Sequence, residues 1–265
     1  MTIPAWLRDR MPVLAIPVAL AVGWEAATRT GLLDRRYFVP LTEIAATIWQ
    51  LTVTGVLTEE VKATVLRLLV AFTIAAAGGV VLGIASGWWR PVAMLIRPVV
   101  DTIYPTPKIA LLPLLIILVG LGESAFIATA FATALFQITL SVAASVRALD
   151  PTLVEAGRNF GATGHRFLLR LLLPGILPGL LNGLRLGMAT CLITVIVVEF
   201  VAAGSGVGHL INLAWQQLQV DRMYAGLVLA GLLGHAINLG FRGLERLLLP
   251  WRPRATVPVG GVAMA

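Results

Sequence analysis

Long apolar runs are the feature that most constrains this chain. Residues 63–87, "ATVLRLLVAFTIAAAGGVVLGIASG", carry a single charged side chain, Arg67. Apolar segments of about 18 residues or more are typical of membrane-spanning helices, because about 20 helical residues cross the hydrocarbon layer. Over the whole chain 12% of the residues are charged, whereas soluble domains average about 25%. The sequence therefore predicts an all-α polytopic membrane protein.

About six membrane spans can be drawn in one transmembrane domain that covers residues 1–254. The first span contains Glu25, and the third is interrupted by Pro105, Pro107 and Pro113. Proline removes a backbone donor and crowds the preceding turn, so we expect the third span to be kinked. The predicted spans are 11–28, 63–87, 102–120, 124–146, 177–203 and 223–247.

Glycines gather in the second and sixth predicted spans. Small residues let helix backbones approach closely in lipid, where packing drives helix association. We therefore expect close helix packing at Gly78, Gly79, Gly83, Gly226, Gly231, Gly234 and Gly240.

The positive charges between the spans predict the orientation. Most Lys and Arg residues fall on one side, which holds Lys108 and the arginines of the loop 147–176. Because Lys and Arg are retained in the cytoplasm during insertion, this side and both termini are expected to be cytoplasmic. On the other side, the segment 43–54 resembles an amphipathic helix lying along the membrane. Residues 255–265 are expected to form a disordered tail.

Several kinds of chemistry are not expected. A nucleotide-binding P-loop needs the pattern G-x-x-x-x-G-K-[ST], but the two lysines, Lys62 and Lys108, follow Val61 and Pro107. Enzymatic activity, and ATP hydrolysis in particular, is therefore not expected of this chain. The net charge of +7 fits cytoplasmic loops better than a nucleic-acid partner.

Metal and protease sites are not expected either. The single cysteine, Cys191, excludes an internal disulfide. No histidine has a close His or Cys neighbour, as a zinc site would need. Ser205 in "AGSGVGH" lacks the glycines of the G-x-S-x-G nucleophile motif; the glycines around it are expected to form a turn before an amphipathic segment, 209–219.

The loop 147–176 contains a charged stretch, "EAGRNFGATGHRFLLRLLLP" (155–174), between apolar spans. Helix-capping and helix-breaking residues predict a compact helix–turn–helix here. The signals are a cap at Asp150 with Pro151 in the first turn, a stop at Gly161, a second cap at Thr163, and Pro174 as the end of the second helix.

This stretch resembles the "EAA" loop of ABC-importer permeases. Glu155-Ala156-Gly157, then Gly161, then Leu171-x-Leu173-Pro174 match its spacing, with Gly157 in place of Ala and Leu171 in place of Ile. In that family the loop forms coupling helices that lie in a cleft of the ATP-binding subunit. Phe160 and Phe167 either enter that cleft or fold back onto the membrane domain. The expected coupling residues are Glu155, Ala156, Gly157, Phe160, Gly161, Phe167 and Pro174.

The resemblance extends along the chain. Segments 24–40, 97–123 and 183–211 look like the nitrate/sulfonate/taurine branch of these permeases, although no serine precedes Arg67 in "ATVLR". The resemblance implies a type I ABC importer permease fold in a bacterial inner membrane, and alternating access for a small anionic, sulfonate-like or nitrate-like solute. It also implies an ATPase that holds ATP and Mg, and a periplasmic or lipoprotein solute-binding protein. The second permease subunit is either another copy, forming the homodimer that we favour, or a paralogue, and membrane lipid surrounds the domain. No cofactor is expected on this chain.

Polar residues within the predicted spans are candidates for the translocation path. Glu199 is interpreted either as a gate residue or as an interfacial acid paired with Arg222. The threonines either line the path or hydrogen-bond to their own helix backbone. His235 and Asn238 are expected to form interhelical hydrogen bonds. The candidates are Thr106, Gln137, Asn182, Thr190, Thr194 and Glu199.

One alternative function follows from two of these residues. Glu199 and His235 are both ionisable and both lie within predicted spans, so they are candidates for a proton relay. The alternative is a proton-coupled secondary transporter; the inverted repeats common in such proteins were not found.

Overall fold

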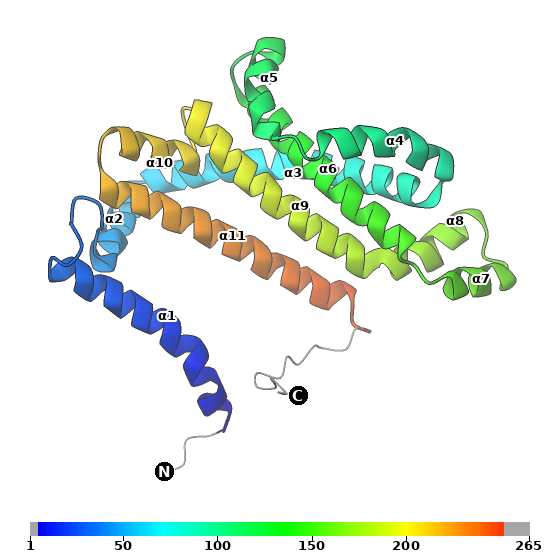
Figure 1. Cartoon of the computed structure of the whole chain (residues 1–265), viewed down its shortest axis with the longest axis horizontal. Coiled ribbons are helices and arrows are strands. Elements are labelled where there is room, and N and C mark those ends of the chain that lie inside the picture. The colour runs from blue at the N-terminus through cyan, green and yellow to red at the C-terminus, as the bar shows by residue number, and fades with distance from the viewer. Residues whose placement is uncertain (1–4, 252–265) are drawn as a thin grey trace.

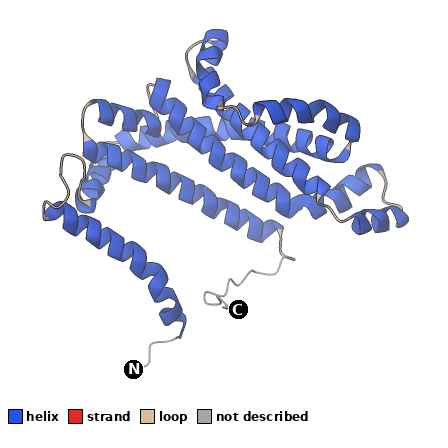
Figure 2. Ribbon diagram, in the orientation of Figure 1, coloured by secondary structure: helices blue, strands red, loops and turns tan. Residues whose placement is uncertain are grey.

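The computed structural model describes residues 5–251, with side chains from residue 15 onward. All regular structure in this part of the chain is helical (Figure 2). The predicted tail at 255–265 lies outside the described residues. The elements are α1 (Ala5–Arg29), α2 (Leu41–Val53), α3 (Val56–Trp88), α4 (Arg90–Ile103), the 3-10 helix η1 (Lys108–Leu111), α5 (Leu112–Val119), α6 (Glu123–Arg147), α7 (Pro151–Asn159), α8 (Gly164–Phe167), the π-helix η2 (Leu168–Leu172), α9 (Leu173–Ala202), α10 (Val207–Gln216) and α11 (Val220–Leu248).

Four of the described helical stretches are long and apolar enough to cross a membrane: α3, α6, the continuous stretch from α8 to α9, and α11. A fifth span forms if α4 and the stretch from η1 to α5 are counted together, with a bend of 90° between them. Pro105 and Pro107 lie in this bend. The third predicted span is therefore strongly bent, as its prolines indicated, and its first half begins earlier than expected, at Arg90.

Helix α6 lies between α3 and α9 and forms the centre of the bundle (Figure 1). Glycines on both neighbours, spaced four residues apart, let the backbones approach. A Cβ added at Gly83 of α3 would lie 2.6 Å from Cβ of Val142, and one at Gly183 of α9 would lie 2.8 Å from Cβ of Ser141. The two stripes are Gly79, Gly83 and Gly87 on α3, and Gly179, Gly183 and Gly187 on α9.

The glycines of the sixth predicted span behave differently. In α11, a Cβ at Gly231 or Gly240 would meet no atom within 4 Å, and one at Gly234 would meet only Leu192, at 3.7 Å. Gly226 alone is tightly packed, against Ile211. The expectation of close packing is therefore confirmed for α3 and wrong for most of α11 within this chain, because Gly231 and Gly240 face away from its other helices and Gly234 makes only an ordinary contact with Leu192.

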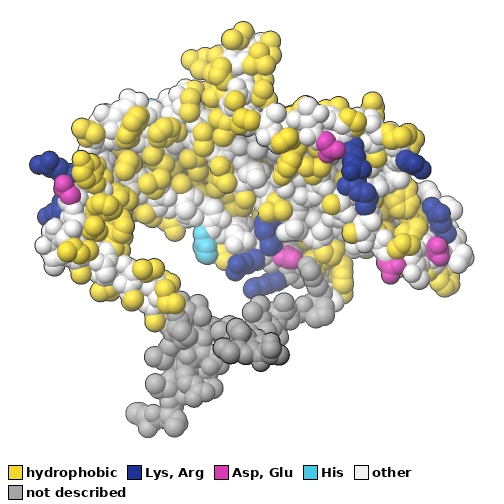
Figure 3. All heavy atoms as spheres, viewed as in Figure 1, with side chains coloured by type: hydrophobic (Ala, Val, Ile, Leu, Met, Phe, Trp, Pro, Cys, Tyr) yellow, Lys and Arg dark blue, Asp and Glu magenta, His cyan; other side chains and the backbone are white. Residues whose placement is uncertain are grey.

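The two ends of the bundle carry different elements (Figure 1). At one end α2 and α10 pack against α11, with Leu51 and Val207 among the buried residues of a small apolar cluster. Thr47 of α2 also contacts Asp221 of α11 through a hydrogen bond of 3.1 Å. The segment 43–54 is thus helical, as predicted. At the other end lie α7 and α8. Hydrophobic side chains cover much of the surface between these ends (Figure 3).

Candidate functional site

The first half of the predicted coupling loop folds as its local sequence indicated. The carboxylate of Asp150 accepts a hydrogen bond of 2.8 Å from the backbone N–H of Thr152, which caps α7. Gly161 follows α7 with φ of +75°, a conformation that glycine adopts without steric cost. The backbone N–H of Ala162 then donates to the carbonyl of Gly157 at 2.9 Å and closes the turn.

The second half of the loop differs from the prediction in two ways. Thr163 occupies the position before α8, but its side chain makes no capping hydrogen bond. Pro174 does not end the second helix, because it lies in the first turn of α9 and the helix continues to Ala202. The π-helical turn η2 directly precedes this proline. A wider turn of this kind changes the hydrogen-bond register, which lets a residue without an N–H be accommodated.

The structure gives a packing reason for Gly157, which stands where the family motif has alanine. A Cβ at this position would lie 2.0 Å from Cδ1 of Leu171 in η2. The missing methyl group therefore lets α7 pack directly on the π-helical turn that leads into α9. Ala156 beside it is half-buried.

Phe160 and Phe167 differ in which of the two predicted alternatives they follow, display toward a partner or packing onto the membrane domain. Phe160 is 92% exposed at the end of α7. Phe167 is 8% exposed and packs against Trp88 at the end of α3, with ring centroids 4.9 Å apart. Glu155 is also exposed and contacts no described residue through a hydrogen bond or ion pair. Phe167 therefore folds back onto the membrane domain, whereas Glu155 and Phe160 are displayed on the surface of α7.

The candidate path residues do not form one cluster. Thr190 and Thr194 donate to backbone carbonyls of their own helix, at 3.0 and 2.9 Å, and Thr194 is buried. Asn182 is exposed on α9. Thr106 lies in the bend after α4, and Gln137 of α6 accepts a hydrogen bond of 3.1 Å from the Tyr104 hydroxyl. The two threonines of α9 thus follow the local alternative, backbone bonding.

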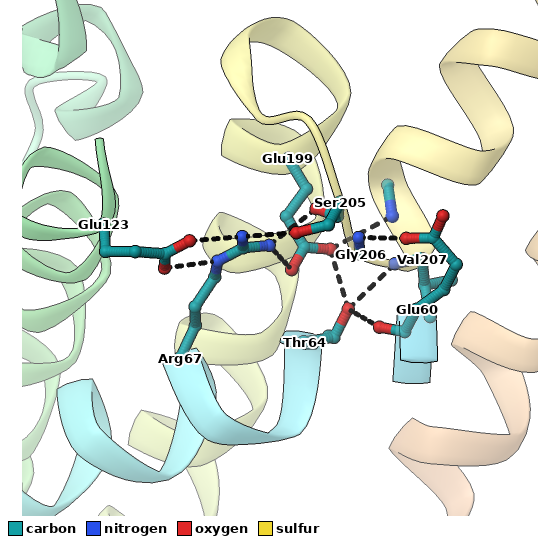
Figure 4. A network of polar contacts seen from close by, with 9 residues as sticks. Glu60, Thr64, Arg67, Glu123, Glu199, Ser205, Gly206 and Val207 are labelled. Atoms are coloured by element: carbon teal, nitrogen blue, oxygen red, sulfur yellow. Dashed lines mark hydrogen bonds and ion pairs between the residues drawn. The ribbon is translucent and has the colours of Figure 1, made fainter. Parts of the chain in front are cut away.

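Glu199 is buried within a polar network (Figure 4), at the end of the bundle opposite α7 (Figure 1). Arg67 of α3 donates to its carboxylate at 2.7 Å and forms a two-pronged contact with Glu123 at the start of α6, at 2.6 and 2.7 Å. The same guanidinium donates to the backbone carbonyl and the hydroxyl of Ser205, at 2.6 and 2.9 Å. One arginine therefore joins α3, α6, α9 and the loop before α10.

The second oxygen of the Glu199 carboxylate is also bonded. It accepts a hydrogen bond of 2.8 Å from the Thr64 hydroxyl and one of 3.1 Å from the backbone N–H of Gly208. The Thr64 hydroxyl in turn accepts from the backbone N–H of Val207 at 2.8 Å. This arrangement satisfies a buried acid that would otherwise be costly in a membrane protein.

The glycines near Ser205 allow the loop to lie directly on Glu199. Gly206 has φ of +111°, and a Cβ there would lie 2.2 Å from Cδ of Glu199. A Cβ at Gly208 would lie 2.1 Å from the carbonyl oxygen of Ile196. The backbone N–H of Gly206 also donates to the Glu60 carboxylate. The predicted glycine turn is present, and the helix after it begins at residue 207.

The structure corrects two sequence-based expectations and adds two residues that were not predicted. Glu199 pairs with Arg67, not with Arg222. Arg67 and Glu123 were not predicted as site residues; the signal that pointed to Arg67 was its isolation in an apolar run. His235 is exposed on α11, and neither it nor Asn238 forms a hydrogen bond with the described residues. No cluster of His, Cys, Asp and Glu suited to a metal ion occurs in residues 5–251.

Comparisons with known proteins agree with this architecture. A family model described as "Binding-protein-dependent transport system inner membrane component" matches residues 79–252. The taurine transport system permease protein TauC of Escherichia coli (strain K12) is 29% identical, covering 93% of this chain and 92% of that protein. The aliphatic sulfonates transport permease protein SsuC of the same organism is 31% identical over 90% of both chains.

Solved structures show the same fold. A chain of the inward-facing MetNI methionine ABC transporter has a TM-score of 0.60 and 25% identity, covering 76% of this chain and 98% of that one. A chain of an amino acid ABC transporter has a TM-score of 0.58 at 16% identity, covering 77% of this chain and 97% of that one. The bundle thus has the type I fold of ABC-importer transmembrane subunits.

The fold and the sequence together define a membrane permease of the ABC-importer class. The chain belongs to the family of binding-protein-dependent transport system inner membrane components, in its nitrate/sulfonate/taurine branch. The relatives are transport permeases, and the proton-coupled alternative with Glu199 and His235 is not supported.

Proposed function

We propose that the chain imports a small anionic solute, sulfonate-like or nitrate-like, and is driven by a separate ATPase through the loop 147–176. ATP and Mg are held by that partner, and this chain binds no cofactor of its own. The solute class is supported by the taurine and aliphatic sulfonate permeases among the relatives.

The observation that carries the coupling proposal is the surface of α7. Glu155 and Phe160 are exposed there, while Gly157 packs tightly against Leu171. An apolar side chain that is 92% exposed at the end of a charged helix fits a partner cleft better than water. The expected coupling surface thus combines displayed residues, Glu155 and Phe160, with Ala156, Gly157, Gly161, Phe167 and Pro174, which shape the loop.

The route of the coupling follows from the helix that α7 contacts. The π-helical turn η2, which holds Leu171, continues into α9, and α9 reaches Glu199 in the network at the far end of the bundle. A displacement of α7 by the ATPase would therefore be passed to α9 as a rigid element. ATP binding and solute delivery would each favour a different one of two states, as alternating access requires.

The remaining partners and the orientation are proposed on the sequence and the family. A solute-binding protein delivers the solute at the α10 end, a second copy of the chain completes the path as a homodimer, and lipid surrounds the apolar surface (Figure 3). The excess of Lys and Arg supports cytoplasmic termini. The residues 1–254 act as a single transmembrane domain, with Thr106, Gln137, Asn182 and Glu199 as candidates for its path or gate.

The test is reconstitution with the cognate ABC-type ATPase subunit and its binding protein. Phe160→Ala and Glu155→Ala are expected to lose co-purification of the ATPase or its stimulated hydrolysis, while the permease still elutes as a folded species. Lys62→Ala, exposed at the opposite end, is the control and should behave as wild type. Normal ATPase association and stimulation in both α7 variants would overturn the coupling proposal.

A further inference from the structure

Lys108 lies at the middle of the membrane domain. It begins η1 at the 90° bend between α4 and α5, and its ammonium group is 6.0 Å from the ring centroid of Phe136 in α6. Phe136 is 13 residues from the start of α6 and 11 from its end. At 1.5 Å per residue these separations are about 20 and 16 Å. The sequence-based count placed Lys108 among the cytoplasmic charges, whereas the structure sets it beside the middle of α6.

The surroundings of Lys108 leave its charge uncompensated. Its ammonium group donates to the carbonyls of Tyr104 and Thr106, at 2.6 and 3.5 Å, and lies 4.9 Å from the Tyr104 ring centroid. No carboxylate in the described part of the chain forms an ion pair with it. An ionisable residue at this depth is costly, and such residues mark ion or substrate sites.

Other hydrogen-bonding groups adjoin the lysine. The Tyr104 hydroxyl contacts the Gln137 amide oxygen at 3.1 Å, and both Tyr104 and Thr106 are exposed within this chain. Non-helical backbone at membrane depth is tolerated where it lines a cavity or a protein interface, and broken helices form solute sites in several transporters. The bend therefore presents one cation and neutral hydrogen-bonding groups on an accessible surface.

We propose that Lys108 forms an anion subsite of the translocation path, with Tyr104, Thr106 and Gln137 beside it. The ligand class is a small oxyanion group, such as a sulfonate or nitrate. The inference deepens the proposed function and depends on it for the anionic nature of the solute. A purely structural lysine would exert the same field on a nearby group, so the subsite is distinguished from it by protection from an added oxyanion and by the loss of anion uptake.

The charge can be tested without knowing the solute. In a Cys191→Ala background, Thr106→Cys introduces a single thiol into the bend. Its rates with an anionic sulfonate-bearing methanethiosulfonate and a cationic trimethylammonium-bearing one are measured in detergent at low ionic strength, each normalised to the reagent's rate with a free small thiol. At about 6 Å in water a unit charge changes each rate about threefold in opposite directions, so we expect about a tenfold preference for the anionic reagent.

Two variants show whether Lys108 is the cause. Lys108→Met in the same background should reduce the preference to about one, and Lys108→Arg should retain it, with each variant eluting as wild type. Nitrate or taurine, added separately as probes, should slow the anionic reagent in the protein that retains Lys108 and not in Lys108→Met. No slowing by either anion in the protein that retains Lys108 would overturn the subsite. A preference near one in the protein that retains Lys108 overturns the subsite, and this result does not depend on whether Lys108→Met folds.

A transport measurement separates this inference from the proposed function. With the ATPase and binding protein in proteoliposomes, Lys108→Met should lower anion uptake per ATP at least about tenfold, while Lys108→Arg restores most of it. If the α7 variants abolish coupling but Lys108→Met transports normally, the subsite is wrong and the importer mechanism stands. If nitrate or taurine protects the thiol only where Lys108 is present but no ATPase associates, the subsite stands and the coupling proposal fails.

Discussion

The guanidinium of Arg67 and the carboxylate of Glu199 form an ion pair of 2.7 Å in which the side chains are 5% and 0% exposed. The pair joins α3 to α9, and Glu123 extends it to α6. These are the three helices whose packing forms the centre of the bundle. The network therefore fixes the end of the bundle opposite α7, and its bonds would have to be retained or exchanged in any change of state there.

Removing one partner of this pair should be strongly destabilising. Glu199→Gln leaves the Arg67 charge buried with only Glu123 to balance it, and we expect a loss of about 3 kcal/mol. Unfolding can be followed with a thiol-reactive fluorescent maleimide, because the single cysteine, Cys191, is buried. Glu123→Gln is the matched control: its side chain is 60% exposed, so the loss should be about 1 kcal/mol or less. Equal unfolding temperatures for Glu199→Gln and wild type would contradict the prediction.

The loop between α9 and α10, which packs on Glu199, should tolerate an alanine at Gly204 but not at Gly206. Gly206→Ala places a methyl group 2.2 Å from Cδ of Glu199 at a φ of +111°, so the loop must move and the bonds to Glu199 and Glu60 should weaken. Gly204→Ala meets no atom within 4 Å. In the same maleimide assay, only Gly206→Ala should unfold at a lower temperature. A similar decrease for both variants would indicate that the loop needs flexibility, not space.

Alanine substitutions should have different effects on stability at a packed and at an unpacked glycine of the membrane helices. Gly83→Ala brings a Cβ to 2.6 Å from Cβ of Val142, and overpacking of this kind costs about 1–3 kcal/mol. Gly240→Ala of α11 meets no atom within 4 Å and should be neutral or slightly stabilising, since alanine favours a helix over glycine. The two variants are compared by thermal unfolding of the purified protein. A larger loss for Gly240→Ala would show that the α11 face is covered in the assembled protein.

At the contact between α7 and the π-helical turn, the effect of Gly157→Ala should be reversed by a second substitution, Leu171→Ala. Gly157→Ala restores the family's usual residue but places a Cβ 2.0 Å from Cδ1 of Leu171. The Leu171 side chain must therefore rotate or α7 must shift, and stimulated ATPase activity should decrease about twofold. Gly157→Ala with Leu171→Ala removes the clash and should recover activity relative to Gly157→Ala alone. The measurement is ATPase activity of the reconstituted complex, with Leu171→Ala alone as the control. Failure of the double variant to recover would mean that this contact does not transmit the coupling.

Much of the local structure followed from local sequence signals. The long apolar runs predicted the positions of α3, α6 and α11, because hydrophobicity acts over one continuous segment. Asp150 and Gly161 predicted the cap and the turn at the two ends of α7, since each acts through its own backbone geometry. Pro174 was wrongly predicted to end the second helix of the loop. A proline ends a helix where the preceding turn cannot change its hydrogen bonding, and here the π-helical turn η2 accommodates the proline.

The functional arrangements depended on residues far apart in the chain. Nothing near Glu199 in the sequence indicated that Arg67, 132 residues earlier, would be its partner, and the nearest guess along the chain, Arg222, was wrong. Lys108 was counted with the cytoplasmic charges although it falls within the predicted span 102–120, because charge counting uses only the position along the chain; the structure sets it beside the middle of α6.

The sequence by itself determined where the long apolar helices α3, α6, α9 and α11 lie, which family the chain resembles, and where the turn after α7 falls, because these depend on composition and on motifs within short stretches. Helix α1, which holds the first predicted span, is not among the described helices long and apolar enough to cross a membrane. The tertiary structure decided which polar residues meet, because a buried charge is stable only when helices from distant parts of the chain bring its partners within hydrogen-bonding distance.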